Sequence, residues 1–330
     1  MMGSKSRMQG KVSPERSAIT AVYVGIDVCK ERLDVYIHPV GLTLAFANSA
    51  QGIKRLKRSL TAHKVALVAM EATGKFHRAA HRSLHADGFA VAIVNPLRSR
   101  LFAEAAGTLA KTDRVDARML AIMGECLDPE ISEPPSELME TVQELTRCRA
   151  AAVAARTALL NQHAAAQAGA ATLEIKRQLR AAETAIENLG AEIERLIGAD
   201  PLLARRLAIL ASIPGVGTIT AIALIAGLAE IGSLSAKEAA MIVGLAPIAC
   251  DSGENSGARH IRGARAHLRR ALYMAAVAAA RFNPPLKAFY ERLLTNGKKP
   301  KVALTAVMRK LIVLANTLIR QNRLWEPHHA

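Results

Sequence analysis

Four carboxylates in this chain of 330 residues have positions suited to binding a hard divalent cation. Asp27 ends the apolar stretch 23–27, and Glu71 directly follows the apolar stretch 65–70. An acid at the end of a buried strand is held rigidly and is costly to bury without a partner. Asp113 and Asp116 are three residues apart, which places both on one face of a helix. Such oxygen ligands predict a metal site for phosphate chemistry.

The net charge indicates which class of molecule carries the phosphates on which such a metal site would act. The chain has 44 Lys and Arg against 28 Asp and Glu, a formal charge of +16. This excess favours a polyanionic partner, most simply nucleic acid, although a generally basic composition is the alternative. The four cysteines are scattered without a CxxC pair, which argues against a zinc site or disulfides and suits a cytoplasmic protein.

No signal peptide is expected, because residues 1–17 are polar and basic. Residues 207–229 carry no charge and are long enough to span a membrane. The turn residues Pro214 and Gly215 interrupt this stretch. We therefore expect a buried helix-turn-helix there and no membrane partner.

The elements that position the acids follow from apolar patterning. Strands are expected over 21–28, 32–37, 42–47, 65–70 and 89–94, and helices over 51–63 and 76–86. Three strands, a helix and then alternating strands and helices predict an α/β layer fold with a mixed sheet.

Composition divides the chain into four parts. A basic arm, 1–20, precedes the α/β domain, 21–128, and prolines at 129, 134 and 135 mark its end. Residues 129–200 form a helical connector, and 201–330 a largely helical C-terminal domain. Apolar residues between Leu179 and Leu196 alternate at spacings of four and three, which fits either a helical hairpin or a dimer seam.

Each acid has a plainer interpretation. Nucleases of the ribonuclease H and RuvC type place their first metal ligand at such a position on the first strand. Actin-like kinases also begin with a strand that contains Gly-x-Asp, as in Gly25-Ile26-Asp27. Asp27 could also be purely structural. The further phosphate and adenosine motifs of the kinases do not occur. Glu71 could cap a helix or form an ion pair. Asp113 and Asp116 could stabilise a helix N-terminus.

A series of motifs narrows these alternatives. They are Gly-Ile-Asp-Val-Cys-Lys at 25–30, Met-Glu-Ala-Thr-Gly at 70–74, Lys-Thr-Asp-Arg-Val-Asp-Ala-Arg at 111–118, Ser-Ile-Pro-Gly-Val-Gly at 212–217, Asp-Ser-Gly at 251–253 and Leu-Arg-Arg-Ala-Leu-Tyr-Met at 268–274. Their order over about residues 21–320 resembles the transposases of insertion-sequence family 110. The motif at 111–118 is the most specific of them.

The resemblance implies an N-terminal ribonuclease-H/RuvC-like domain followed by a mostly α-helical connector and C-terminal domain. It makes Asp27, Glu71, Asp113 and Asp116 a tetrad that binds two Mg²⁺ ions, and Ser252 the nucleophile. Family members are understood to use a bridge RNA that pairs with donor and target DNA, and to pass through a covalent phosphoserine. In their active sites the tetrad and the serine are thought to come from different protomers, which implies a homo-oligomer, either a dimer or a tetramer.

Residue chemistry gives Ser252 modest support. It precedes Gly253 in a loop followed by several arginines, which could stabilise charge on a phosphate. A serine hydroxyl needs a metal or base to become a good nucleophile. A Ser-Gly pair is also a common turn, and Ser256 is a competing candidate.

Backbone contacts to nucleic acid are predicted in the C-terminal half. The hairpin at 213–218 resembles a helix-hairpin-helix module, whose amides bind phosphate, or it is a tight buried connection. Aromatic residues make up only 3% of the chain, so stacking on bases should not be widespread. The predicted contact residues are Lys111, Gly215, Gly217, Arg259, Arg262, Arg265, Arg269, Arg270, Lys298, Lys299 and Lys301.

The prediction is therefore a Mg²⁺-dependent, RNA-guided DNA transposase. It acts in the cytoplasm, at the nucleoid when active. The alternatives are a RuvC-like endonuclease that uses water and a nucleic-acid-binding protein without activity.

Overall fold

The computed structural model describes residues 21–108, 113–248, 260–261 and 265–327. The chain divides into two compact units, Met1–Pro135 and Ser136–Ala330. The finer division into an arm and three domains stays a prediction.

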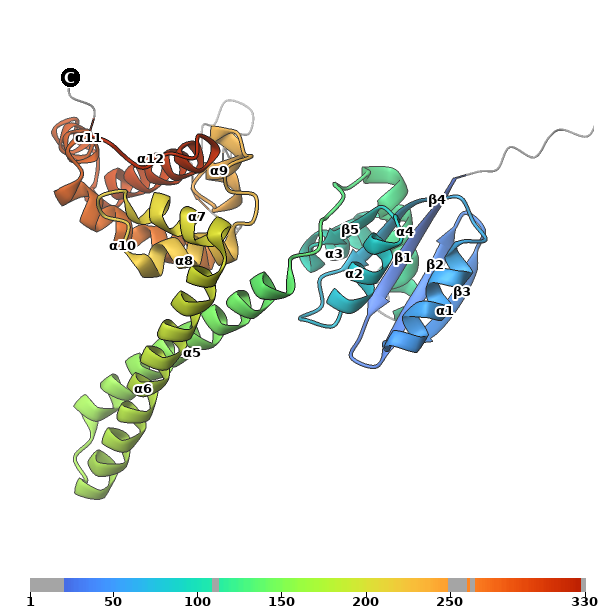
Figure 1. Ribbon diagram of the computed structural model, residues 1–330, viewed down its shortest axis with the longest axis horizontal. Helices are drawn as coiled ribbons and strands as arrows, with labels where there is room; N and C mark the ends of the chain where they lie inside the picture. Colours follow the sequence, from blue (N-terminus) through green and yellow to red (C-terminus); the bar gives the residue numbers. More distant parts are fainter. Residues whose placement is uncertain (1–20, 109–112, 249–259, 262–264, 328–330) are drawn as a thin grey trace, which may run out of the picture. The chain divides into compact units, whose positions relative to one another are not determined.

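A five-stranded mixed sheet forms the centre of the first unit, with strand order β3-β2-β1-β4-β5 (Figure 1). The strands are β1 (Val22–Val28), β2 (Arg32–His38), β3 (Leu42–Ala47), β4 (Val65–Glu71) and β5 (Val91–Val94). The first three pair antiparallel as a meander, whereas β4 is parallel to both β1 and β5. The predicted mixed α/β fold is confirmed.

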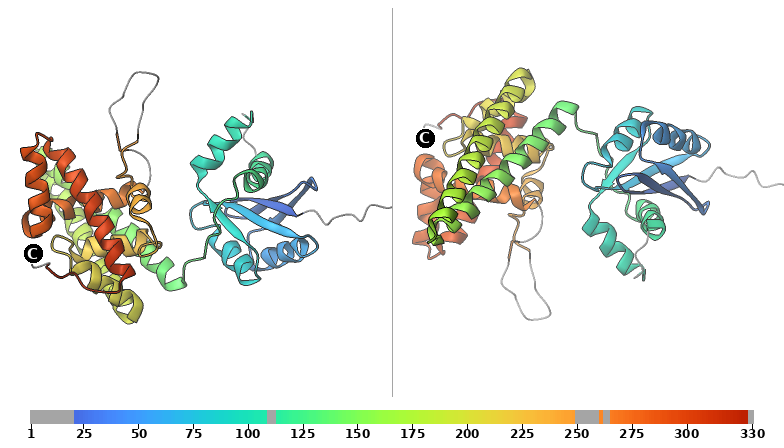
Figure 2. Two further views of the ribbon diagram at one scale, coloured as in Figure 1. Left: turned by 90° about the horizontal axis from the view of Figure 1, so that it is seen from above. Right: turned by 90° about the horizontal axis from the view of Figure 1, so that it is seen from below.

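Helices cover both faces of this sheet (Figure 2). On one face lie α1 (Ala50–Leu60) and α2 (Arg78–Ala86), whose buried residues Leu56 and Leu84 pack with alternate strand residues such as Ile26. The other face carries α3 (Pro96–Ala105) and α4 (Asp113–Leu127), which enclose a smaller cluster around Leu120.

Gly25 allows α4 to lie directly on β1. A Cβ atom added at Gly25 would come within 1.9 Å of the Ala117 carbonyl oxygen and 2.4 Å of the Ala121 amide nitrogen. Only a residue without a side chain permits this approach. The glycine of the Gly-Ile-Asp motif therefore sets the distance between sheet and helix.

The second unit begins with two long helices, α5 (Glu137–Ala165) and α6 (Gly169–Ala199), which pack along one another as a hairpin (Figure 1). Ile186 and Ile193, two of the predicted heptad positions, are buried. The structure shows the helical hairpin, and the dimer seam stays a prediction.

Among the described residues in the rest of this unit, six shorter helices share one core. They are α7 (Pro201–Ala211), α8 (Thr218–Gly227), α9 (Ala236–Ile242), α10 (Ala266–Phe282), α11 (Pro284–Thr295) and α12 (Pro300–Arg320). The apolar stretch 207–229 is divided between α7 and α8, as predicted. Within the described residues, α12 has the length and composition of a membrane span, but Leu311, Ile312 and Leu318 are buried in the core.

Candidate active site

Asp27 and Glu71 occupy equivalent positions on two neighbouring parallel strands. The register of β1 and β4 places Gly25 opposite Ala69 and Ile26 opposite Met70. The next residues along the two strands are Asp27 and Glu71. Because adjacent strands lie about 4.8 Å apart, this register brings the two carboxylates together at the carboxyl end of the sheet.

Both carboxylates belong to the face of the sheet that α4 covers. Gly25 lies against α4, and the Ala69 side chain is 3.6 Å from the Cβ position of Gly124 in the same helix. Side chains alternate along a strand. Asp27 and Glu71, each two residues further on, therefore face the same side as Gly25 and Ala69.

The Glu71 carboxylate is oriented by α3. Ser99 Oγ donates a hydrogen bond to Glu71 Oε2 at 2.9 Å. Asn95 caps this helix, since its Oδ1 accepts from the Leu97 amide at 2.9 Å. Ser99 is buried and Glu71 half-buried, so one carboxylate oxygen is fixed by the protein. Such a supporting hydrogen bond is typical of groups that orient a metal ligand.

The direction of α4 brings the other two acids to this end of the sheet. Ala117 lies against Gly25, whereas Gly124, two turns later, lies against Tyr23 and Leu67, nearer the start of the strands. The N-terminal turn of α4 is therefore at the carboxyl end of β1. Asp113 begins this helix and Asp116 is in its first turn.

The residue types at this end fit a hard cation, but the described side chains do not form a complete cage. Asp27 and Asp116 are half-buried and each has an interaction partner within the protein. The side chain of Asp113 is outside what the structure describes. Within the described part, no group of three or more His, Cys, Asp and Glu residues is placed to hold a metal ion. Carboxylate oxygens remain the ligands that Mg²⁺ prefers.

Asp34 is a further acid on this face that the sequence did not single out. It pairs directly with Asp27 across the β1–β2 ladder and is only 6% exposed. Arg32 Nε donates to Asp34 Oδ2 at 2.8 Å and compensates its charge. The sequence signal was the hairpin itself, because residues equally far from a tight turn pair with one another.

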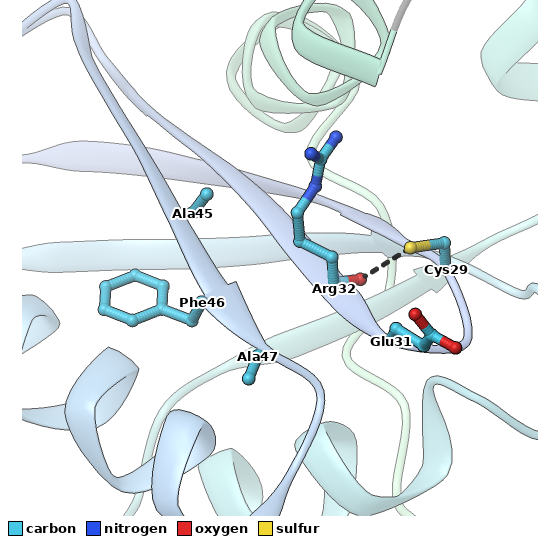
Figure 3. Close-up of a pocket in the computed structure, with 6 residues that line it drawn as sticks. All are labelled: Cys29, Glu31, Arg32, Ala45, Phe46 and Ala47. Atoms are coloured by element: carbon cyan, nitrogen blue, oxygen red, sulfur yellow. Dashed lines mark hydrogen bonds between the residues drawn. The ribbon is translucent and has the colours of Figure 1, made fainter.

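A closed turn fixes the end of β1 (Figure 3). The Cys29 amide donates to the Arg32 carbonyl at 3.0 Å, and Cys29 Sγ donates to the same oxygen at 3.2 Å. Asn48 Nδ2 adds a hydrogen bond to the Cys29 carbonyl at 2.9 Å. An open pocket of about 630 Å³ lies beside this turn, with Arg32 and Phe46 in its lining. These contacts hold Asp27 in place, and Cys29 contributes to the turn.

Several predicted residues of the other half lie outside the described residues. They are Ser252, Ser256, Arg259 and Arg262, together with Lys111 of the first unit. Their roles stay predictions.

Arg265 is engaged within the protein. Its guanidinium donates to both oxygens of Glu230, at 2.8 and 2.6 Å, and to the Gly227 carbonyl at 2.9 Å. Burial alone would raise the pKa of Glu230, but the hydrogen bonds, chiefly those from Arg265, outweigh it and lower that pKa. The pKa of His267 is lowered by burial and by the charges of Arg265 and Arg270. A phosphate would have to share the Arg265 guanidinium with Glu230.

The glycine hairpin between α7 and α8 has both a packing role and an exposed side. Gly215 has φ +100°, and a Cβ there would lie 2.5 Å from the Ala279 amide nitrogen. Gly217 is the exposed N-cap of α8. Exposed basic residues among the predicted contacts are Arg270, Lys298, Lys299 and Lys301. Arg269 is half-buried near the Gly244 carbonyl.

This sheet order, with acids at the ends of β1 and β4, defines a ribonuclease-H/RuvC-like domain joined to a helical C-terminal region. Residues 24–170 match the DEDD transposase model of insertion-sequence family 110. Residues 207–291 match the model described as transposase of the IS116/IS110/IS902 family. The chain belongs to the IS110 family of transposases.

Two of the similar proteins align over nearly the whole chain. The pilin gene-inverting protein of Moraxella bovis is 30% identical over 321 residues, which cover 92% of this chain and 98% of that protein. The protein of the same name from Moraxella lacunata has the same identity and coverage. An uncharacterised 43.6 kDa protein of insertion element IS110 from Streptomyces coelicolor is 31% identical over 140 residues, 42% of this chain and 34% of that protein.

Proposed function

We propose that this chain is a Mg²⁺-dependent DNA recombinase that cuts and exchanges the strands of an insertion sequence. The register that places Asp27 and Glu71 on neighbouring parallel strands, under the N-terminus of α4, supports this most directly. Membership of the IS110 transposase family supports DNA as the substrate.

Asp27, Glu71, Asp113 and Asp116 would hold the metal ions. Divalent ions bound between such carboxylates polarise a phosphodiester and stabilise the attacking and leaving oxygens. The protein contributes rigid positions. β1 and β4 fix two carboxylates, Ser99 orients Glu71, and α4 carries the remaining pair.

Ser252 would be the nucleophile. Its Oγ attacks phosphorus while its proton passes to a base, and the bond from phosphorus to the deoxyribose oxygen breaks. The released hydroxyl takes up a proton, and the phosphodiester is conserved as a phosphoserine ester. Attack by another DNA hydroxyl then restores the serine and joins new strands.

A bridge RNA would supply sequence specificity by pairing with donor and target DNA. The low aromatic content and the charge of +16 suit a protein that grips nucleic-acid backbones while base pairing reads the sequence. Residues for the backbone contacts would be Gly217, Arg270, Lys298, Lys299 and Lys301, all exposed.

Inversion of a DNA segment is the second candidate outcome. The similarity to proteins named for inverting a pilin gene covers 98% of their length. Insertion and inversion would share the same cutting and joining steps. A plasmid with two sites in inverted orientation would separate the two outcomes.

The test is a cleavage assay with purified protein, the noncoding RNA that flanks its gene, Mg²⁺ and end-labelled donor DNA. We expect a band retarded by covalently attached protein that depends on RNA and Mg²⁺. It should be lost in Ser252→Ala and kept in Ser256→Ala. The reverse pattern would assign the nucleophile to Ser256. Free cleaved ends without an adduct would identify an endonuclease that uses water.

A further inference from the structure

A cavity of about 650 Å³ opens in the second unit between α11, α12 and the stretch 323–326. Leu286, Leu314 and the aromatic residues Phe289 and Trp325 contribute to its lining. Among the described residues, its charged lining consists of Arg309, Lys310 and Arg323 and one carboxylate, that of Glu326. This size is typical of small-ligand sites, and the lining suits an apolar ring that carries a negative group.

Asn283, one of the residues that line this cavity, has a side-chain hydrogen-bond donor that the protein does not use. It is 1% exposed, and its Oδ1 caps α11 by accepting from the Leu286 amide at 3.3 Å. Its Nδ2 is buried and has no hydrogen-bond partner within the described structure. Buried polar groups are normally paired, so this amide indicates an acceptor that is supplied from outside.

Asn316, another buried asparagine of the same core, has hydrogen-bond partners for both its side-chain oxygen and its side-chain nitrogen. It is also 1% exposed, but its Oδ1 accepts from the Gly232 amide and its Nδ2 donates to the Leu234 carbonyl, both at 2.7 Å. The fold therefore satisfies both ends of a buried asparagine at one position and only one end at the cavity.

Trp325 provides the flat surface. Its backbone amide donates to Ser212 Oγ at 2.8 Å, which anchors the tail against the end of α7. The side chain is half-buried, packed partly on the core. Lys310 Nζ already lies 4.3 Å from the centre of the Phe289 ring. Trp325 is therefore the aromatic surface better placed to stack on a ligand.

We propose that this cavity binds one unstacked base of a single-stranded nucleic acid. The base stacks on Trp325, and a carbonyl oxygen or ring nitrogen of the base accepts the hydrogen bond from Asn283 Nδ2. The neighbouring phosphates contact Arg309 and Arg323. The proposal rests on the proposed function in one respect only, that nucleic acid is the partner. Such stacking tolerates different bases, because every base has an aromatic face.

Trp325 is the single tryptophan of the chain, so tryptophan fluorescence reports on the surroundings of this one side chain. The full-length protein is titrated with 5′-phosphorylated oligodeoxyadenylate, with the matching oligoadenylate, and with a short duplex. We expect saturable quenching by single strands and none by the duplex. The two single-stranded titrations distinguish DNA from RNA as the source of the base.

Variants test the individual contacts. Asn283→Ser keeps a hydroxyl that can cap α11 but removes the amide, and should raise the Kd about tenfold. The exposed Arg309→Gln should weaken binding without affecting the fold. Arg177→Gln, which removes an arginine paired with Glu174 on α6, is the control for general loss of charge.

Three results would overturn the proposal. The first is Trp325 fluorescence that stays unchanged with every oligonucleotide. The second is binding by Asn283→Ser and Arg309→Gln as tight as that of the wild type. The third is emission that shifts with protein concentration alone, which would show that a second copy of the chain occupies the cavity. If the protein recombines DNA but its Trp325 fluorescence does not change with any oligonucleotide, only the proposal that this cavity binds a base is refuted. Quenching without any DNA cleavage refutes only the proposed function.

Discussion

At the scale of single residues, Asp27 and Glu71 derive their importance from their neighbours. Each would be an ordinary half-buried acid alone. The parallel register and the hydrogen bond from Ser99 make them a pair with a common orientation. Asp34, opposite Asp27, adds a third acid whose charge Arg32 compensates.

Asp27→Asn and Glu71→Gln should each abolish DNA cleavage and leave the fold intact. Both changes keep the side-chain shape and remove a charged ligand. The transition state then loses several kcal/mol of stabilisation, which lowers the cleavage rate by about 10³-fold. Cleavage rates and circular dichroism check this. Glu104→Gln, an exposed acid paired with Arg100 on α3, is the control and should cleave normally. Near-normal cleavage by Asp27→Asn would refute its role.

Glu230→Gln should lower stability in a pH-dependent way. The folded pKa of Glu230 lies below its value of about 4.5 in the unfolded chain, so its contribution is present above that pH and is lost as the pH falls through the folded pKa. We expect a deficit on the order of 1 kcal/mol at pH 7, since the pair is partly exposed. Denaturant unfolding at several pH values should show this deficit shrink as the pH falls below about 4.5 and vanish once the pH lies below the folded pKa of Glu230. A deficit independent of pH would contradict the assignment.

At the scale of elements, the contact between α4 and β1 determines where the acids meet. Gly25→Ala should destabilise the first unit by about 1–3 kcal/mol or more, because the new methyl group would meet helix backbone that cannot rotate away. It should also reduce cleavage by displacing the N-terminal turn of α4.

Gly124→Ala is the matched control on the same helix. Its Cβ would meet only side-chain atoms at 3.6 Å or more, and alanine favours a helix interior by about 1 kcal/mol. Thermal unfolding of both variants provides the test. Equal stability of Gly25→Ala and the wild type would show that the close approach does not determine this packing.

The sequence predicted most elements of the first unit because they are encoded locally. Strand 65–70 and helix 51–63 end within a few residues of β4 and α1. Helix α3 was not predicted, since Asn95-Pro96 suggests the end of a strand. The same pair also starts a helix, as N-cap and first-turn proline, and the structure uses it that way.

The site was only partly predictable, because its geometry is not local. The sequence indicated that Asp27 and Glu71 end strands, but their adjacency depends on β4 pairing with β1 rather than with β3. The lack of a hydrogen-bond partner for Asn283 Nδ2 depends on how α11, α12 and residues 323–326 pack together. Apolar periodicity does not contain that information.

At the scale of the whole molecule, the net charge of +16 predicts that nucleic-acid binding is strongly weakened by salt. Lys298, Lys299 and Lys301 are exposed at the N-terminus of α12, the end of a helix where cations are unfavourable. Their position therefore suggests a role in binding rather than in stability.

Replacing these three lysines with glutamine should reduce the slope of log K against log salt by roughly 2–3 without lowering the unfolding midpoint, because cations at a helix N-terminus do not stabilise the helix. Fluorescence anisotropy with labelled DNA across a salt series measures the slope. A variant with Arg177 and Arg195 replaced, both paired with glutamates on α6, serves as control. An unchanged slope in the lysine variant would exclude these residues from the interface.

The proposed function requires that the acids at the carboxyl end of the sheet hold divalent ions for DNA cleavage. Counting bound Mn²⁺ by electron paramagnetic resonance, in wild type and in Glu71→Gln with donor DNA present, tests it most directly. We expect the wild type to bind Mn²⁺ tightly and Glu71→Gln to lose most of this binding together with its cleavage activity. Equal Mn²⁺ binding by the two proteins would contradict it.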